Sequence, residues 1–252
     1  MMPRYWIALG TLLSVLSGGP LLGAQEIDHQ LWDQLLRTYV DDAGLVDYEG
    51  VQSQRDLLDA YLASLTASDP TPLDSKAQLA FWINAYNACV FKGVLDHPGI
   101  ASVQDVKGFF DNIRYPVAHA SLTLNEIEAR GRARGDWRIH MAVVCASSSC
   151  PYLRHEAYAA DRLEEQLTEQ AKRFLADETR GLRLDGRTLG LSKIFKWYAK
   201  DFVPTGRLSA ATLMPILAAY VPPPIVEVAE QPGVSLQFFD YNWSLNDRGG
   251  TR

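Results

Sequence analysis

The segment from Asp74 to Leu95 has helical periodicity, yet it is apolar on almost every side. Its large apolar residues are Leu79, Phe81, Trp82, Ile83, Tyr86, Val90, Phe91, Val94 and Leu95. A helix without a polar face is stable in water only when other elements surround it. Asn84, Asn87 and Lys92 make the segment a poor membrane span. The chain is therefore expected to fold around this one central helix.

Shorter patterns predict the elements that surround it. Apolar spacing and capping residues indicate helices at 28–39, 56–65, 156–175, 193–202 and 209–220, and a capping box at 123–126. Strands are indicated at 118–124, 138–145 and 234–241, and Asp185-Gly186 indicates a hairpin within 182–191. We expect an α+β class, a mostly helical domain with a small antiparallel sheet. No repeat or Gly/Ser-rich linker divides the chain, so residues 25–252 are predicted to form one domain.

Composition narrows the classes of function. The chain has 252 residues, is 47% hydrophobic and carries a formal net charge of -6. An acidic chain is a poor partner for nucleic acid or an anionic membrane, so we expect neither. A chain of this size buries enough surface to fold without a metal or disulfide framework. No phosphate loop or dinucleotide-binding glycine motif is present, and we predict neither a cofactor nor a metal.

The first 24 residues are typical of a secretory signal. Arg4 is followed by an apolar run from Trp6 to Leu16, and small residues precede a predicted cleavage after Ala24. Leu22 is larger than the residue usually found three positions before the cleaved bond, and an uncleaved N-terminal anchor is the alternative. We expect an exported protein, periplasmic or secreted, with no stable membrane insertion once residues 1–24 are removed.

One segment combines a nucleophile with a flexible polar turn. The predicted strand at 138–145 contains His140 and ends at Cys145, which is followed by Ala-Ser-Ser-Ser and Cys150. A side chain at such a junction is both firmly held and reachable, and free turn amides favour a thiolate and an oxyanion. His140 is the obvious base. On a continuous strand, however, residues five apart face opposite sides, so the two meet only if Cys145 has left the strand.

Other interpretations of the same residues remain open. Cys145 and Cys150 could form a disulfide in an exported protein, and Cys89 would then be a packed core thiol. His140, Cys145, Cys150 and His155 recur every five residues, which is not a familiar zinc spacing. His140 could also be a core histidine bonded to a backbone carbonyl. A redox role is weaker because four residues, not two, separate the cysteines.

Several long strings resemble the domain of unknown function 547 family. They are Val46-Asp47-Tyr48, Phe81-Trp82-Ile83-Asn84-Ala85-Tyr86-Asn87-Ala88, Arg138-Ile139-His140, Val144-Cys145-Ala146-Ser147, Cys150-Pro151, Leu191-Ser192-Lys193-Ile194-Phe195-Lys196-Trp197-Tyr198 with Asp201-Phe202, and Asp240-Tyr241-Asn242-Trp243-Ser244-Leu245-Asn246. The resemblance extends over nearly all of the predicted mature chain. The last of these strings contains two aromatic residues close to the terminus, and we expect it to pack back against the domain.

The resemblance implies a thiol-peptidase-like or transglutaminase-like site in a papain- or transglutaminase-like fold. Cys145 would be the nucleophile, His140 the base, and Glu128 or Asn84 the group that orients it. The family commonly has a histidine where this chain has Ala129, so activity would be impaired if that histidine were the base.

Further residues are candidates for substrate binding. They are Asn84, Asn87, Ser147 and Arg154, although the two asparagines could instead brace the loop around Cys145, and Arg154 could form a salt bridge with Glu156 or Asp161. We expect a monomeric thiol-dependent hydrolase or acyl transferase acting on a peptide, amide or thioester. The alternative is a binding module for a peptide or small anion, with Cys145 structural or disulfide-bonded.

Overall fold

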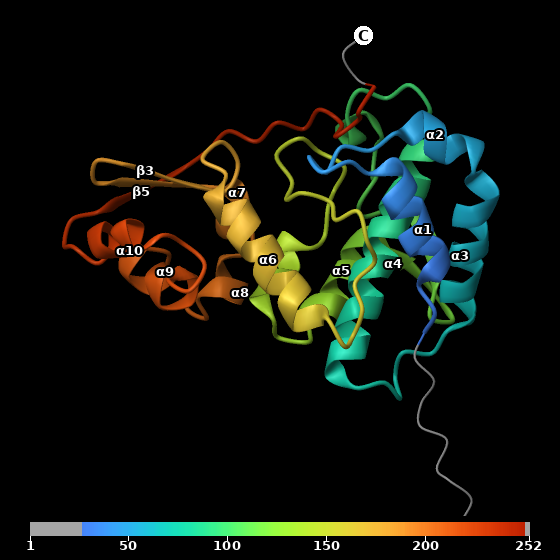
Figure 1. Ribbon diagram of the computed structural model, residues 1–252, viewed down its shortest axis with the longest axis horizontal. Coiled ribbons are helices and arrows are strands. Elements are labelled where there is room, and N and C mark those ends of the chain that lie inside the picture. The colour runs from blue at the N-terminus through green and yellow to red at the C-terminus, as the bar shows by residue number, and fades with distance from the viewer. Residues whose placement is uncertain (1–26, 250–252) are drawn as a thin grey trace, which may run out of the picture.

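The computed structural model describes residues 27–249 of the chain. The predicted signal at 1–24 lies outside these residues. Helix α4 (Ser75–Leu95) lies at the centre of the larger half of the molecule, and almost all of its side chains from Leu79 onward are buried (Figure 1). Asp74 caps it by accepting a hydrogen bond from the backbone N–H of Ala77. The predicted central helix is confirmed.

The larger half of the molecule packs around α4. Its elements are α1 (Gln30–Tyr39), α2 (Tyr48–Ser53), α3 (Arg55–Ala67), the 3-10 turns η1 (Val103–Asp105) and η2 (Trp137–Met141), the hairpin β1 (Arg114–Val117) and β2 (Ala120–Thr123), and α5 (Leu124–Arg132). Helices α1 to α3 lie together on one side of α4, and α5 packs against it (Figure 1). We call the apolar cluster that they bury the large core.

A second group of elements forms the smaller half. It comprises α6 (Leu163–Ala176), β3 (Leu182–Asp185), β4 (Thr188–Leu191), α7 (Lys193–Trp197), α8 (Ala199–Phe202), α9 (Ala210–Leu217), α10 (Pro223–Ala229) and β5 (Ser235–Phe238). These elements bury an apolar cluster of their own, the small core, to which Met141 of η2 also contributes, whereas Leu163 and Leu167 of α6 belong to the large core. Strand β4 is central in its sheet, antiparallel to β3 and parallel to β5.

The last residues return from the smaller half to the larger one. After β5, residues 239–249, which we call the C-terminal strap, run back across the molecule to the region of α2 (Figure 1). Val46 donates its backbone N–H to Asn246, Leu245 donates to Ala101, and Asn246 donates to Ala146, at 2.8 to 3.0 Å. The prediction that this segment packs back against the domain is confirmed.

The α+β class is confirmed, and several boundaries differ from the prediction. The segment 118–124 is half of a hairpin whose turn, at Ala118 and His119, has positive φ angles of 50° and 58°. The helix predicted from 156 begins at Leu163, because Glu156 is buried in a salt-bridge cluster and the backbone of 157–158 bonds to Asp33 and to Asn84. The last strand is parallel to its neighbour, so the larger sheet is mixed. Within residues 27–249, no helix is both long and apolar enough to cross a membrane.

Candidate functional site

A cavity of about 530 Å³ lies where the large core meets the small core. Its chemically distinctive buried or half-buried lining consists of a carboxylate, an imidazole and two sulfurs: Glu128, His140, Cys145 and Cys150. Much of the remaining lining is aromatic: Tyr86, Phe109, Phe110, Trp197, Tyr198, Tyr241 and Trp243. The structure therefore brings the three predicted catalytic side chains, Glu128, His140 and Cys145, to a single cavity.

The segment that carries His140 and Cys145 is not the predicted strand. Residues 137–141 form the 3-10 turn η2, which begins where Asp136 accepts a hydrogen bond from the backbone N–H of Arg138. The amide of Asn87 then replaces a sheet neighbour: it donates to the carbonyl of Ala142 at 3.0 Å and accepts from Val144 at 2.9 Å. Because this backbone is irregular, the alternation rule does not keep residues 140 and 145 on opposite faces.

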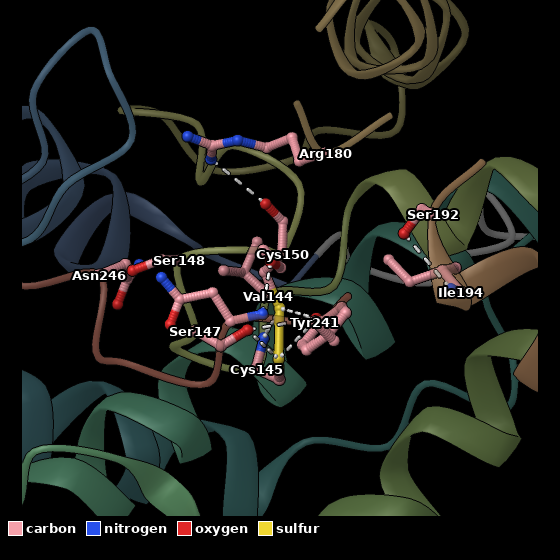
Figure 2. The surroundings of a disulfide bond; sticks show 12 residues. Val144, Cys145, Ser147, Ser148, Cys150, Arg180, Ser192, Ile194, Tyr241 and Asn246 are labelled. Carbon is pink, nitrogen blue, oxygen red and sulfur yellow. Dashed lines mark hydrogen bonds between the residues drawn. A yellow bond between two sulfur atoms is a disulfide. The ribbon is translucent and has the colours of Figure 1, made fainter. Parts of the chain in front are cut away.

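Cys145 and Cys150 are joined by a disulfide bond. Figure 2 shows the hydroxyl of Tyr241, on the strap, beside both sulfurs, 3.4 Å from Cys145 Sγ and 3.2 Å from Cys150 Sγ. A disulfide sulfur has no proton to give, so this hydroxyl is the donor. In this state Cys145 is an electrophilic half of a bridge and not a nucleophilic thiolate.

The turn after Cys145 is strained and only partly available to an oxyanion. Ala146 is buried and has a φ of 61°, a left-handed conformation that costs a non-glycine residue energy. The backbone N–H groups of Ser148 and Ser149, predicted as oxyanion donors, bond instead to carbonyls of the strap. Among the residues that the structure describes, none accepts from the N–H groups of Ala146 and Ser147.

His140 is held by a carboxylate from the smaller half of the molecule. Its Nε2 donates to Asp201 Oδ2 at 2.8 Å, and Arg132 holds the same carboxylate through two nitrogens at 2.6 and 3.0 Å. The imidazole also lies over the ring of Tyr198, with centroids 4.1 Å apart. Burial lowers the pKa of His140 to about 4, and the hydrogen bond to Asp201 opposes that shift only in part. The imidazole is therefore neutral at neutral pH, with Nδ1 as its basic nitrogen.

The resemblance implied that Glu128 could orient His140. In the structure, Glu128 bonds to Tyr198 instead. It is 6% exposed, and its Oε2 accepts from the Tyr198 hydroxyl at 3.1 Å. Its Oε1 is buried and has no hydrogen-bond partner among residues 27–249. Burial raises the pKa of the Glu128 carboxyl, and the bond from Tyr198 opposes this shift. The cavity is thus lined by a carboxylate of which one oxygen accepts no hydrogen bond from the described residues.

Aromatic side chains surround the cavity on the side of the smaller half. Trp197 is 48% exposed, and its ring lies 5.8 Å from that of Trp243 in a stacked arrangement and 4.8 Å from that of Tyr241. The first of these residues ends α7 and the other two belong to the strap. An exposed, interlocked aromatic group at a cavity is a surface suited to binding an organic ligand.

The other predicted binding residues lie outside the cavity lining. Asn84 is buried, donating to the carbonyl of Tyr158 and accepting from its N–H, so both asparagines of α4 bond to backbone. Ser147 lies beneath the bridge, its hydroxyl 3.2 Å from Cys145 Sγ. Arg154 forms salt bridges with Glu156 and Glu169, and not with Asp161.

Sequence reasoning missed the residues that the smaller half contributes. Asp201 lies 61 positions after His140, and only its presence in a family-like string singled it out. Ala129, where the family commonly has histidine, is exposed and is not among the lining residues. His155, part of the alternative metal pattern, lies 3.7 Å from Asp42, away from the cavity. Among the described residues no group of three or more His, Cys, Asp or Glu side chains is arranged to hold a metal ion.

Comparison with known proteins gives a family and nothing beyond it. No curated protein and no solved structure matches the chain. The family described as "Protein of unknown function, DUF547" matches residues 70–175, which include α4, α5, η2, the disulfide loop and most of α6. The segment that matches this family is the one that provides Glu128, His140 and Cys145 to the cavity.

Proposed function

We propose that the cavity is the active site of a thiol-dependent hydrolase or acyl transferase, in which Cys145 becomes the nucleophile once its bridge to Cys150 is reduced. The observation that carries the proposal is that Cys145 lines the same cavity as His140, whose imidazole is hydrogen-bonded to Asp201. A thiol and an imidazole oriented by a carboxylate are the parts of a thiol-peptidase-like site.

The residues would act in a defined order. A thiol reductant supplies two electrons and two protons, which convert the bridge into two thiols. His140 accepts the Cys145 proton on Nδ1, since its Nε2 is bonded to Asp201. The thiolate attacks the acyl carbon of a peptide, amide or thioester, and His140 returns the proton to the leaving group. The N–H groups of Ala146 and Ser147 are the nearest candidates for stabilising the oxyanion.

Thiol alkylation tests this assignment without knowledge of the substrate. Fully reduced protein is treated with iodoacetamide across a pH series, and each cysteine is quantified by peptide mass spectrometry. Cys145 should be alkylated faster than Cys150 at neutral pH, because an imidazole in the same cavity that takes the thiol proton activates the thiol as a nucleophile. Cys150 from the same loop is the matched control, and Cys89, whose pKa burial raises, should stay unmodified.

Two variants decide whether His140 is responsible for the reactivity of the Cys145 thiol. His140→Ala should move the alkylation profile of Cys145 to that of an ordinary thiol, and Asp201→Asn should shift it partway. If Cys145 reacts no faster than Cys150, or if its profile is unchanged in both variants, the enzyme proposal is wrong. A panel of chromogenic thioesters and amides then seeks turnover, which Cys145→Ala should abolish.

The disulfide itself favours a second function. With Cys145 bridged, the same cavity is a binding site for a peptide or small molecule without chemistry. In that case the bridge fixes the loop at 145–150, and reduction should weaken ligand binding instead of starting turnover. A bridge that persists under strong reductant in the native protein would favour this second function.

We also propose that the protein is exported and acts as a monomer. The pattern of residues 1–24 supports export, and an exported location would suit a protein with a disulfide. Expression of the full chain with a C-terminal tag, followed by fractionation and N-terminal sequencing, should give a mature protein beginning at Gln25. Size-exclusion chromatography with light scattering should give the mass of one chain.

A further inference from the structure

We propose that the cavity binds its ligand through a primary ammonium group, which pairs with Glu128 and lies between aromatic rings. This inference deepens the proposed function, because it names a chemical class for the ligand of the same cavity. It rests on that cavity being the functional site, and it does not depend on the thiol chemistry.

The first support is the incomplete bonding of Glu128. Glu128 is 6% exposed and lines the cavity, and one of its carboxylate oxygens has no hydrogen-bond partner among the described residues. A buried polar atom without a partner costs free energy, and a donor supplied by a ligand removes that cost. An ammonium group has three N–H donors, one of which could bond to this unpartnered carboxylate oxygen.

The second support is the balance of charge around that carboxylate. Arg132, one turn further along α5, attracts Glu128 at longer range, but its guanidinium bonds to Asp201. His140 is neutral at neutral pH, as its lowered pKa requires. Within residues 27–249, Glu128 forms no salt bridge, and Lys107, the lysine of the lining, is exposed and is not paired with it. A cationic ligand would supply a paired counter-charge.

The third support is the aromatic lining. Tyr198 both donates to Glu128 and belongs to an aromatic wall that includes Trp197, Tyr241 and Trp243. The faces of aromatic rings attract cations, and the attraction grows when water is excluded. A carboxylate among such rings favours an ammonium group over an anion, and it favours an ammonium over a neutral hydroxyl of the same shape.

Binding of matched small probes to the oxidised protein tests this inference. Benzylamine, benzyl alcohol and benzoate have the same ring and differ in charge. Binding is measured by titration calorimetry and by the quenching of tryptophan fluorescence. The second method is suitable because Trp197 and Trp243 line the cavity. Benzylamine should bind about tenfold more tightly than benzyl alcohol at neutral pH, and benzoate should bind most weakly.

Two variants assign the preference to one carboxylate. Glu128→Gln should remove the preference for benzylamine over benzyl alcohol while circular dichroism shows an unchanged fold. Asp111→Asn removes a different, exposed carboxylate of the same lining and should keep most of that preference.

Three outcomes would overturn the inference. They are equal affinity for the amine and the alcohol, a preference that persists in Glu128→Gln, and the absence of saturable binding by both benzylamine and the longer phenethylamine. Because these titrations use the bridged protein, their failure leaves the alkylation test of Cys145 untouched. Failure of the alkylation test likewise leaves ammonium binding standing.

Discussion

Glu128 and Glu156 are both buried carboxylates, 6% and 8% exposed, but the protein treats them in opposite ways. Glu156 forms salt bridges with Arg154 and Arg162 and accepts a further hydrogen bond from Gln166 at 3.2 Å. Glu128 accepts one hydrogen bond, from a tyrosine. Burial opposes ionisation of both, but the arginine partners outweigh it at Glu156 and lower its pKa to about 2, whereas the pKa of Glu128 is raised.

The difference separates a structural charge from one available for function. Both carboxylate oxygens of Glu156 accept hydrogen bonds from protein side chains. These bonds, from Arg154 and Arg162, hold the irregular segment before α6 in place. Glu128 has unused bonding capacity and lines a cavity. A buried group that the fold leaves under-bonded indicates a site where a ligand completes the bonding.

The largest effect is expected when the structural carboxylate is removed. Glu156→Gln should lower the free energy of unfolding by about 3 kcal/mol, because it leaves the largely buried guanidinium of Arg154 without its nearest counter-charge. Chemical denaturation monitored by circular dichroism measures this loss. Arg154 also pairs with Glu169, and Glu169→Gln, which removes an exposed carboxylate from the same arginine, should cost less. Equal losses would show that Glu156 has no special role.

Acidification should act on the two carboxylates with opposite sign. The pKa of Glu156 is about 2 in the folded protein against its ordinary value of 4.5, so its contribution is complete above pH 4.5 and is lost as the pH falls toward 2. The raised pKa of Glu128 means that its cost appears as the pH rises above 4.5. Unfolding measured from pH 3 to 7 should therefore show a shallower acid loss for Glu156→Gln and a steeper rise for Glu128→Gln. Parallel profiles for the two variants would contradict the contrast.

Removing the one donor to Glu128 should have a moderate effect. Tyr198→Phe should cost about 1 kcal/mol of stability, the value of one hydrogen bond to a carboxylate that then stays unbonded. It should also raise the pKa of Glu128 further, which infrared titration of its carboxyl band can follow. The stacking on His140 is retained in this variant, so a pKa that stays unchanged would mean that the hydroxyl contributes nothing.

The smallest effect on stability is expected for Glu128 itself. At pH 7, Glu128→Gln should raise the free energy of unfolding by about 0.5 kcal/mol, because glutamine has no charge to bury. Thermal and chemical unfolding beside Glu156→Gln give the comparison directly. A destabilisation as large as that of Glu156→Gln would mean that Glu128 is a structural residue after all.

The parts of the fold that depend on neighbouring residues could be predicted from the sequence. The central helix, the capping box at Thr123, the helix starts near residues 193 and 209, and the hairpin turn after Asp185 all follow local rules, and all are confirmed. Each of these features is determined within a few positions along the chain. That is why the α+β class was accessible without a structure.

The missed features depend on partners far away in the sequence. An apolar run at 138–145 is indistinguishable from a strand until the amide of Asn87, more than 50 positions earlier, is seen to satisfy its backbone. The carboxylate that bonds to His140 likewise comes from Asp201, 61 positions later in the chain. A thiol and an imidazole at one site could be predicted from the sequence, but the residues of the smaller half that line the same cavity could not.

The C-terminal strap has a consequence for how the protein is made. Tyr241 and Trp243, which form part of the cavity wall, lie within the last dozen residues of the chain, and their neighbours bond to Val46 and Ala146. The ribosome makes these residues after the helices of the larger half, so a nascent chain holds those helices before it holds a finished cavity. The cavity is complete only once residues 239–249 have been made, and a chain that stops before them would carry Cys145 and Cys150 without the hydroxyl of Tyr241 beside them.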